Sequence, residues 1–106
     1  MMKTLTWKTA LVTGGTRGIG AASARHLASA GANIAITYSA SAEAATALVR
    51  ELGALGVKAH AYHADAAEPA SLPQVIEQVA ADLGGIDILV NNAGTFSGGM
   101  IGTIDE

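Results

Sequence analysis

A glycine-rich loop, Thr13-Gly14-Gly15-Thr16-Arg17-Gly18-Ile19-Gly20, is the part of this chain whose residue types and spacing point most directly to chemistry. It follows the apolar run Ala10-Leu11-Val12, which predicts a buried strand, and precedes the alanine-rich segment Ala21–Ala30, which contains no Gly or Pro. The first N–H groups of a helix lack intrahelical partners, and the aligned peptide dipoles favour negative charge there. A loop between such a strand and helix is therefore suited to binding a diphosphate.

Three glycines of this loop have separate physical roles. Gly14 is expected to adopt a turn conformation that is closed to other residues. Gly18 would let the backbone approach a phosphate, and Gly20 would let the helix pack closely on the strand. The loop thus predicts a dinucleotide site, and the alternative is a tight turn that binds no phosphate.

The rest of the chain alternates between strand-length apolar runs and helical stretches, which must position the loop. The predicted strands are 10–13, 34–38, 57–62 and 86–90, and the predicted helices are 21–30, 42–55 and 71–83. This alternation is typical of a parallel sheet that helices cover on both faces. We predict an α/β fold, a doubly wound parallel sheet of Rossmann type truncated to about four strands in the order 3-2-1-4 with three helices. Residues 1–106 are expected to form a single dinucleotide-binding half-domain.

Two helices carry clear local signals. The second has Leu48, Leu52 and Leu55 spaced to lie on one face. The third opens with Ser71-Leu72-Pro73-Gln74, which has the spacing of a capping box, and stops at Gly84-Gly85.

Composition and charge narrow the function classes. Six Lys and Arg against nine Asp and Glu, with no basic run, indicate neither a nucleic-acid partner nor an anionic membrane surface. The chain has no cysteine, no signal-peptide pattern at its start and no apolar run of membrane-spanning length. We therefore expect a cytoplasmic protein with a small-molecule partner.

A second motif, Asn91-Asn92-Ala93-Gly94, follows the fourth predicted strand, and Asp65 closes the third. Together with the glycine-rich loop, this motif resembles the short-chain dehydrogenase/reductase family, and within it the group of 3-oxoacyl-carrier-protein reductases. The resemblance covers essentially the whole chain and is to the N-terminal half of such enzymes. It implies hydride transfer between a nicotinamide dinucleotide and a small carbonyl compound or secondary alcohol, and a homo-oligomeric enzyme.

The resemblance also implies the residues of the cofactor site. The glycine-rich loop would bind the diphosphate, Asp65 and the Ala66 backbone would meet the adenine, and 91–94 would line the adenosine ribose. A larger aliphatic residue is usual in the family where Ala66 stands, which weakens that contact. The predicted cofactor-binding residues are Gly14, Thr16, Arg17, Gly18, Ile19, Gly20, Tyr38, Ser39, Asp65, Ala66, Asn91, Asn92, Ala93 and Gly94.

The catalytic residues of the family have no match in this sequence. Its members use a Ser, a Tyr-x-x-x-Lys pair and an Asn, but Tyr38 is followed four positions later by Ala42, and Tyr62 by Ala66. A tyrosine must protonate the carbonyl oxygen as hydride arrives, and a neighbouring lysine must lower its pKa. We expect the 106-residue chain to be inactive by itself. It would supply the cofactor-binding half of an oxidoreductase or, alternatively, serve as a non-catalytic dinucleotide-binding or interaction module.

The end of the second predicted strand indicates which dinucleotide is bound. An Asp or Glu there would accept a hydrogen bond from the ribose 2′-hydroxyl, but the chain has Thr37-Tyr38-Ser39. Without that carboxylate a 2′-phosphate is tolerated, and Arg17 and nearby hydroxyls could bind it. NADP(H) is therefore favoured over NAD(H). The alternative is that Arg17 is a solvated loop charge and that Ser39 and Ser41 are only turn and cap residues.

Several other residues are given structural interpretations. His60 and His63 are expected on opposite faces of a strand, which excludes a shared metal ion. Trp7 is predicted to be a packing anchor, Asp87 to mark the start of the fourth strand, and Asn91 to tie that strand to its neighbours. Solvated helix faces are expected at Glu43, Glu51, Glu77 and Asp82.

Overall fold

The computed structural model describes residues 4–14, 18–64, 68 and 71–91. Within these residues, strands and helices alternate as the sequence predicts. Their order along the chain is β1 (Thr9–Thr13), α1 (Gly18–Ser29), β2 (Asn33–Tyr38), α2 (Ala42–Gly53), β3 (Ala59–His63), α3 (Ser71–Leu83) and β4 (Ile88–Asn91). The α/β fold class is therefore confirmed.

The strands form one parallel sheet in the order β3-β2-β1-β4, as predicted. β1 lies between β2 and β4, so that Leu11 pairs with Ala35 on one side and with Leu89 on the other. All residues of β1 are buried, which explains why its three central residues form a continuous apolar run. Asp87 does mark the start of β4, since its carboxylate accepts a hydrogen bond from the Thr9 N–H at 2.9 Å.

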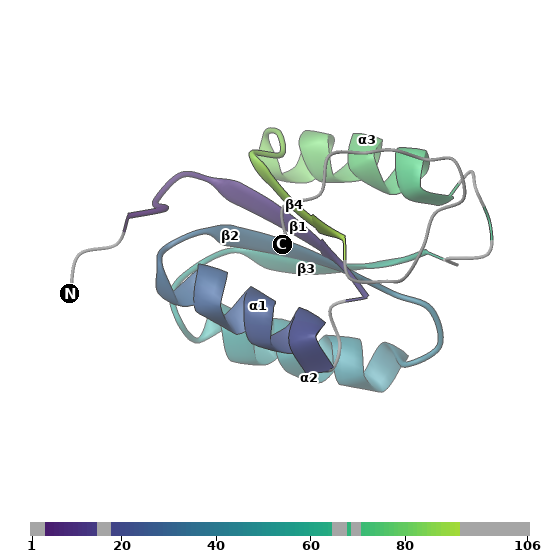
Figure 1. Ribbon diagram of the computed structural model, residues 1–106, viewed down its shortest axis with the longest axis horizontal. Helices are drawn as coiled ribbons and strands as arrows, with labels where there is room; N and C mark the ends of the chain where they lie inside the picture. The colour runs from purple at the N-terminus through teal and green to yellow at the C-terminus, as the bar shows by residue number, and fades with distance from the viewer. Residues whose placement is uncertain (1–3, 15–17, 65–67, 69–70, 92–106) are drawn as a thin grey trace.

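Helices cover both faces of the sheet, with α1 and α2 on one face and α3 on the other (Figure 1). Alternate residues of β1 point to the two faces, so Ala10 and Val12 pack with α1 and α2 while Leu11 packs with α3. The alanines of α1 account for the close approach of that helix, because Ala21, Ala24 and Ala28 are all buried. This three-layer arrangement holds the carboxyl ends of the four parallel strands at one edge of the sheet.

The helix boundaries differ from the predicted ones in ways that matter for packing. α1 begins at Gly18, so the last glycines of the loop belong to its first turn. α2 ends at Gly53, which leaves Leu55 outside the helix and 40% exposed, whereas Leu48 and Leu52 are buried as predicted. By contrast, α3 spans Ser71–Leu83, the range that the sequence predicts, and it begins at the first residue of the capping-box motif.

Trp7 is not the packing anchor that the sequence predicted. Its side chain is 88% exposed, and its backbone has a positive φ of 73°. It stands in a turn in which the Lys8 N–H donates to the Leu5 carbonyl at 2.9 Å, and Leu5 is the residue that packs against the core. A tryptophan was expected to be buried because of its large apolar area, but this one lies on the surface at a position of the turn with a positive φ.

Replacing Trp7 with glycine is expected to stabilise the protein. The left-handed conformation costs a non-glycine residue about 1–2 kcal/mol, while glycine adds about 0.5–1 kcal/mol of backbone entropy to the unfolded chain. The free energy of unfolding of Trp7→Gly should therefore rise by up to about 1 kcal/mol in a urea titration. Trp7→Ala is the control, since alanine keeps the unfavourable φ; an equal gain in both variants would assign the effect to the exposed ring instead.

Tyr62 joins β3 to α3 through a contact that the sequence did not indicate. Its hydroxyl donates to the Asp82 carboxylate at 2.8 Å, so Asp82 has a partner and is not merely part of a solvated helix face. Burial, followed by the hydrogen bond and the charge of Asp82, raises the pKa of Tyr62 above its ordinary value.

This pKa shift predicts an alkaline loss of stability. The unfolded chain releases the phenol proton near pH 10, before the folded chain does, so the free energy of unfolding should fall as the pH rises above about 10. Tyr62→Phe should remove this part of the slope, at a cost of about 0.5–1.5 kcal/mol at neutral pH for the lost hydrogen bond. Urea titrations between pH 8 and about 11 would measure the dependence of the free energy of unfolding on pH. Tyr38→Phe, which removes the other tyrosine and leaves the Tyr62–Asp82 pair intact, is the matched control.

Candidate functional site

The carboxyl end of β1 leads into the turn that opens the glycine-rich loop. Gly14 has a φ of 63°, as expected for a turn conformation that residues other than glycine rarely adopt. Its N–H donates to the Thr37 hydroxyl at 2.9 Å, which ties the loop to the neighbouring β2. Of the predicted diphosphate-binding residues, Thr16 and Arg17 lie outside the described residues.

The first turn of α1 offers an open surface. Gly18 has a φ of 61°, and among the described residues a Cβ placed there would meet no atom within 4 Å beyond its own chain neighbours. Ile19 is 74% exposed, whereas Gly20 is buried, in agreement with the expectation that it allows close helix packing. The need for glycine at Gly18 therefore comes from its backbone conformation and not from crowding, and the surface beside it has room for a ligand.

The end of β4 lies beside the end of β1. The Thr13 hydroxyl donates to the Asn91 side-chain oxygen at 3.1 Å, so Asn91 does tie β4 to its neighbour as the sequence predicted. This contact also orients the Asn91 amide at the carboxyl edge of the sheet. Asn92, Ala93 and Gly94 lie outside the described residues.

The end of β2 lies on the other side of β1. Tyr38 is half-buried and Ser39 is exposed, and no carboxylate stands at either position. Asp65 and Ala66, which were predicted to meet the adenine, lie outside the described residues. The described part of the predicted site is thus spread over the carboxyl ends of β2, β1 and β4 and the start of α1.

His63 belongs to this edge although the sequence interpretation treated it as an ordinary strand residue. Its Nε2 lies 3.0 Å from the Ser39 carbonyl oxygen. The predicted separation of the two histidines holds, since His60 lies on the opposite face and its ring is near Tyr62. Among the described residues no group of three or more His, Cys, Asp or Glu could hold a metal ion. None of the helices described combines the length and apolar character that a bilayer crossing requires.

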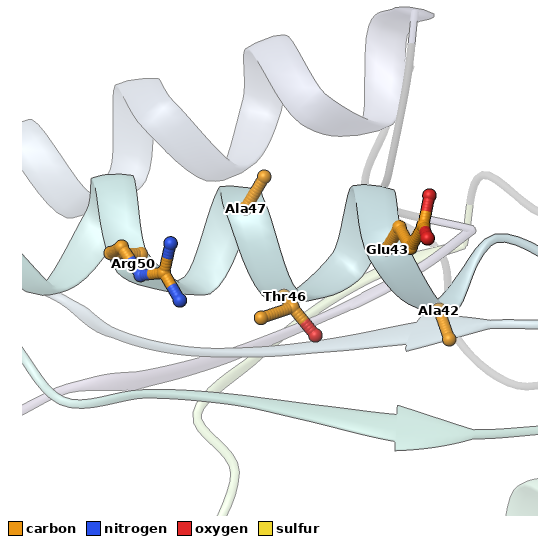
Figure 2. Close-up of a pocket in the computed structure, with 5 residues that line it drawn as sticks. All are labelled: Ala42, Glu43, Thr46, Ala47 and Arg50. Atoms are coloured by element: carbon orange, nitrogen blue, oxygen red, sulfur yellow. The ribbon is translucent and has the colours of Figure 1, made fainter.

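A shallow hollow on the outer surface of α2 is a separate feature. Figure 2 shows the five residues that line it along this helix, and all five are exposed: Ala42, Glu43, Thr46, Ala47 and Arg50. None of the predicted cofactor residues that the structure describes lines this hollow. It lacks the buried, convergent polar groups that a small-molecule site uses, so we do not count it as part of the functional site.

Comparison with known proteins places this architecture in a family. The sequence model described as short chain dehydrogenase matches residues 8–106. The chain belongs to the short-chain dehydrogenase family. The resemblance inferred from the glycine-rich loop and the 91–94 motif is therefore confirmed.

Curated members of this short-chain dehydrogenase family include close relatives. The 3-oxoacyl-[acyl-carrier-protein] reductase FabG of Staphylococcus epidermidis is 44% identical over 87 residues, which is 82% of this chain and 36% of the reductase. The FabG of Staphylococcus aureus is 45% identical over 87 residues, 82% of this chain and 35% of that protein. The chain therefore spans about a third of the length of these reductases.

Solved structures of short-chain dehydrogenases share the fold. A short-chain dehydrogenase from Burkholderia cenocepacia, solved in complex with NADP, superimposes with a TM-score of 0.83 at 55% identity, over 87% of this chain and 38% of that one. A blue fluorescent protein from a metagenomic library, solved with NADPH, gives a TM-score of 0.83 at 55% identity over 86% of this chain and 38% of that one. The part of the family fold present in this chain is the Rossmann portion.

Proposed function

We propose that this chain is the NADP(H)-binding half of a short-chain oxidoreductase that transfers hydride between NADP(H) and a carbonyl compound or secondary alcohol. The observation that carries the proposal is the open first turn of α1, where Gly18 adopts a positive φ and leaves space beside exposed helix-start backbone. A diphosphate fits such a place, because it accepts hydrogen bonds from N–H groups that have no intrahelical partner. Glycine-rich loops of this kind bind the pyrophosphate in dinucleotide folds.

The side chains around this turn would each act on one part of the cofactor. Gly14 and Gly18 would shape the loop around the diphosphate, and Asn91, oriented by Thr13, would contact the adenosine ribose. The remaining predicted contacts, from Thr16, Arg17, Asp65, Ala66 and 92–94, are proposed from the sequence. The bound dinucleotide would supply the hydride, and these residues would bind and orient it.

The end of β2 supports NADP(H) over NAD(H). An acidic residue there would repel a 2′-phosphate, and this chain has an exposed Ser39 instead. Ser39 could donate its hydroxyl hydrogen to the phosphate, and Arg17 could add a charge-assisted bond. The solved relatives that contain NADP and NADPH are consistent with this assignment.

The remaining parts of the proposed function come from the resemblance to the family. The proton donor and its lysine are absent from this sequence, so the 106 residues alone should bind the cofactor without turning it over. The whole enzyme would act on a small carbonyl compound or alcohol, assemble as a homo-oligomer and reside in the cytoplasm. Steady consumption of NADPH by the pure chain would contradict the expected inactivity.

Calorimetric titration of the chain with NADPH and with NADH tests the proposal. The wild-type chain should bind NADPH at least about tenfold more tightly than NADH, which corresponds to about 1.4 kcal/mol. Ser39→Asp should lose most of this preference, because a carboxylate there repels the 2′-phosphate and accepts from the ribose hydroxyl. Thr46→Asp, which adds the same charge on the exposed face of α2, is the matched control and should keep the wild-type ratio. Binding of neither dinucleotide by the wild-type chain would reject the proposal for these residues.

A further inference from the structure

The carboxyl ends of β2 and β3 meet beside the proposed site, with Tyr38 paired with His63 in the register of the sheet. The next residue along the chain, Ser39, turns its carbonyl oxygen to the His63 ring, 3.0 Å from Nε2. A carbonyl oxygen can only accept a hydrogen bond, so Nε2 must carry a hydrogen and His63 must be the donor. This bond joins two segments that are 24 residues apart in the sequence.

Two further contacts join the carboxyl ends of β2 and β3. The rings of Tyr38 and His63 pack edge to face, with centroids 5.5 Å apart and an interplanar angle of 73°. The Ala64 N–H donates to the Tyr38 carbonyl at 2.9 Å. The end of β3 therefore restrains both Tyr38 and Ser39, and the His63 side chain supplies the bond to the more exposed of the two.

Within the part of the chain that the structure describes, the residue that caps α2 does not hold the connection from β2 through its side chain. Ser41 is the N-cap of α2, but its side chain makes no capping hydrogen bond. Ser39 is exposed and stands directly after the end of β2. The Ser39 carbonyl belongs to the peptide that leads on to Ala40, so the His63 bond restrains the chain on the far side of Ser39 from the Tyr38 carbonyl that Ala64 holds.

We propose that His63 is a positioning residue for cofactor selection: by holding the Ser39 carbonyl, it presents Ser39 to the 2′-phosphate of NADP(H). The inference rests on the proposed function, because it assumes that the dinucleotide binds at this edge. His63 itself need not touch the cofactor. Its effect reaches only the part of the ligand that distinguishes NADP(H) from NAD(H), so it should alter the preference between them more than binding in general.

Three variants separate this role from simple structural support. His63→Ala removes the donor, and His63→Gln keeps an N–H donor at a similar reach. His60→Ala is the matched control, since it removes an exposed histidine of the same strand from the opposite face. Each would be titrated calorimetrically with NADPH and with NADH, after its urea midpoint had been compared with that of the wild type.

The expected result is a selective loss of NADPH affinity. His63→Ala should raise the Kd for NADPH about threefold to tenfold, the range expected for one lost hydrogen bond, and change the Kd for NADH less than about twofold. His63→Gln should restore the NADPH affinity to within about twofold of wild type, and His60→Ala should leave both affinities unchanged.

The other outcomes distinguish two kinds of failure. One such outcome is a wild type that prefers NADPH and a His63→Ala variant that keeps that preference or lowers the affinity for both dinucleotides equally. In that case the positioning role is overturned and the proposed function stands. The same conclusion follows if His63→Gln behaves like His63→Ala. If the wild type binds neither dinucleotide, the proposed function and this inference both fall.

Discussion

Gly18→Ala is expected to lower the NADPH affinity of this chain at least about tenfold and its free energy of unfolding by about 1–2 kcal/mol. Gly18 begins α1 with a φ of 61°, a conformation in which the Cβ of an L-residue collides with its own backbone. None of the described residues crowds this position, so the cost is assigned to the backbone conformation. To relieve it, the first turn of α1 must change conformation, and the N–H groups proposed to bind the diphosphate would move with it. Calorimetry with NADPH and a urea titration measure the two effects.

Gly53→Ala is the matched control for this experiment. Gly53 ends α2, and a Cβ there would also meet no atom within 4 Å, but its φ is not positive. Alanine should therefore raise the free energy of unfolding by up to about 1 kcal/mol and leave NADPH binding unchanged. A lower free energy of unfolding in Gly18→Ala and a higher one in Gly53→Ala would confirm the role of the positive φ. A Gly18→Ala variant with wild-type stability and affinity would show that the first turn of α1 does not depend on glycine.

Leu52→Ala is expected to have the largest effect on stability, a loss of about 2–5 kcal/mol. Leu52 is fully buried in the core that α1 and α2 form on one face of the sheet. Truncation removes apolar contacts and leaves a cavity that the surrounding helices and strands fill only in part. A domain of this size is typically stable by about 5–15 kcal/mol, so a single substitution of this kind would remove a large fraction of the total. The midpoint of urea unfolding gives the difference.

Leu55→Ala provides the comparison at the same end of α2. Leu55 lies beyond the last residue of the helix and is 40% exposed, so its truncation should cost less than about 1 kcal/mol. The sequence placed both leucines on one buried stripe, and the structure separates them because the helix ends at Gly53. Equal losses of the free energy of unfolding in the two variants would mean that the buried face of α2 extends past Gly53 to Leu55.

Local patterns were sufficient to predict much of this protein. The continuous apolar run of β1 indicated a strand buried on both faces, and the glycine-rich loop after it indicated a turn at Gly14, which has a positive φ. The alternation of strands and helices predicted the sheet order, because crossover connections in such folds leave few alternatives. These features depend on neighbouring residues, so they can be read from the chain directly.

The helix ends and the environment of single side chains were predicted less well. Trp7 was expected inside because it is large and apolar, but the local turn between Leu5 and Lys8 decided its position. The end of α2 was placed too late, at Leu55, whereas the helix ends at Gly53. Apolar character and short motifs give preferences of about 1 kcal/mol, and tertiary packing readily overrides them.

By itself, the sequence determined the family, the order of the strands and the place of the glycine-rich loop, because these follow from hydrophobic periodicity and from glycines that permit particular backbone angles. Only the tertiary structure decided that His63 reaches Ser39 and that Tyr62 reaches Asp82, pairs that are 24 and 20 residues apart. Such contacts depend on the register between strands and on how each helix lies across the sheet. A side chain's partner across these distances is set by the packing of the whole domain and has no signal in the residues beside it.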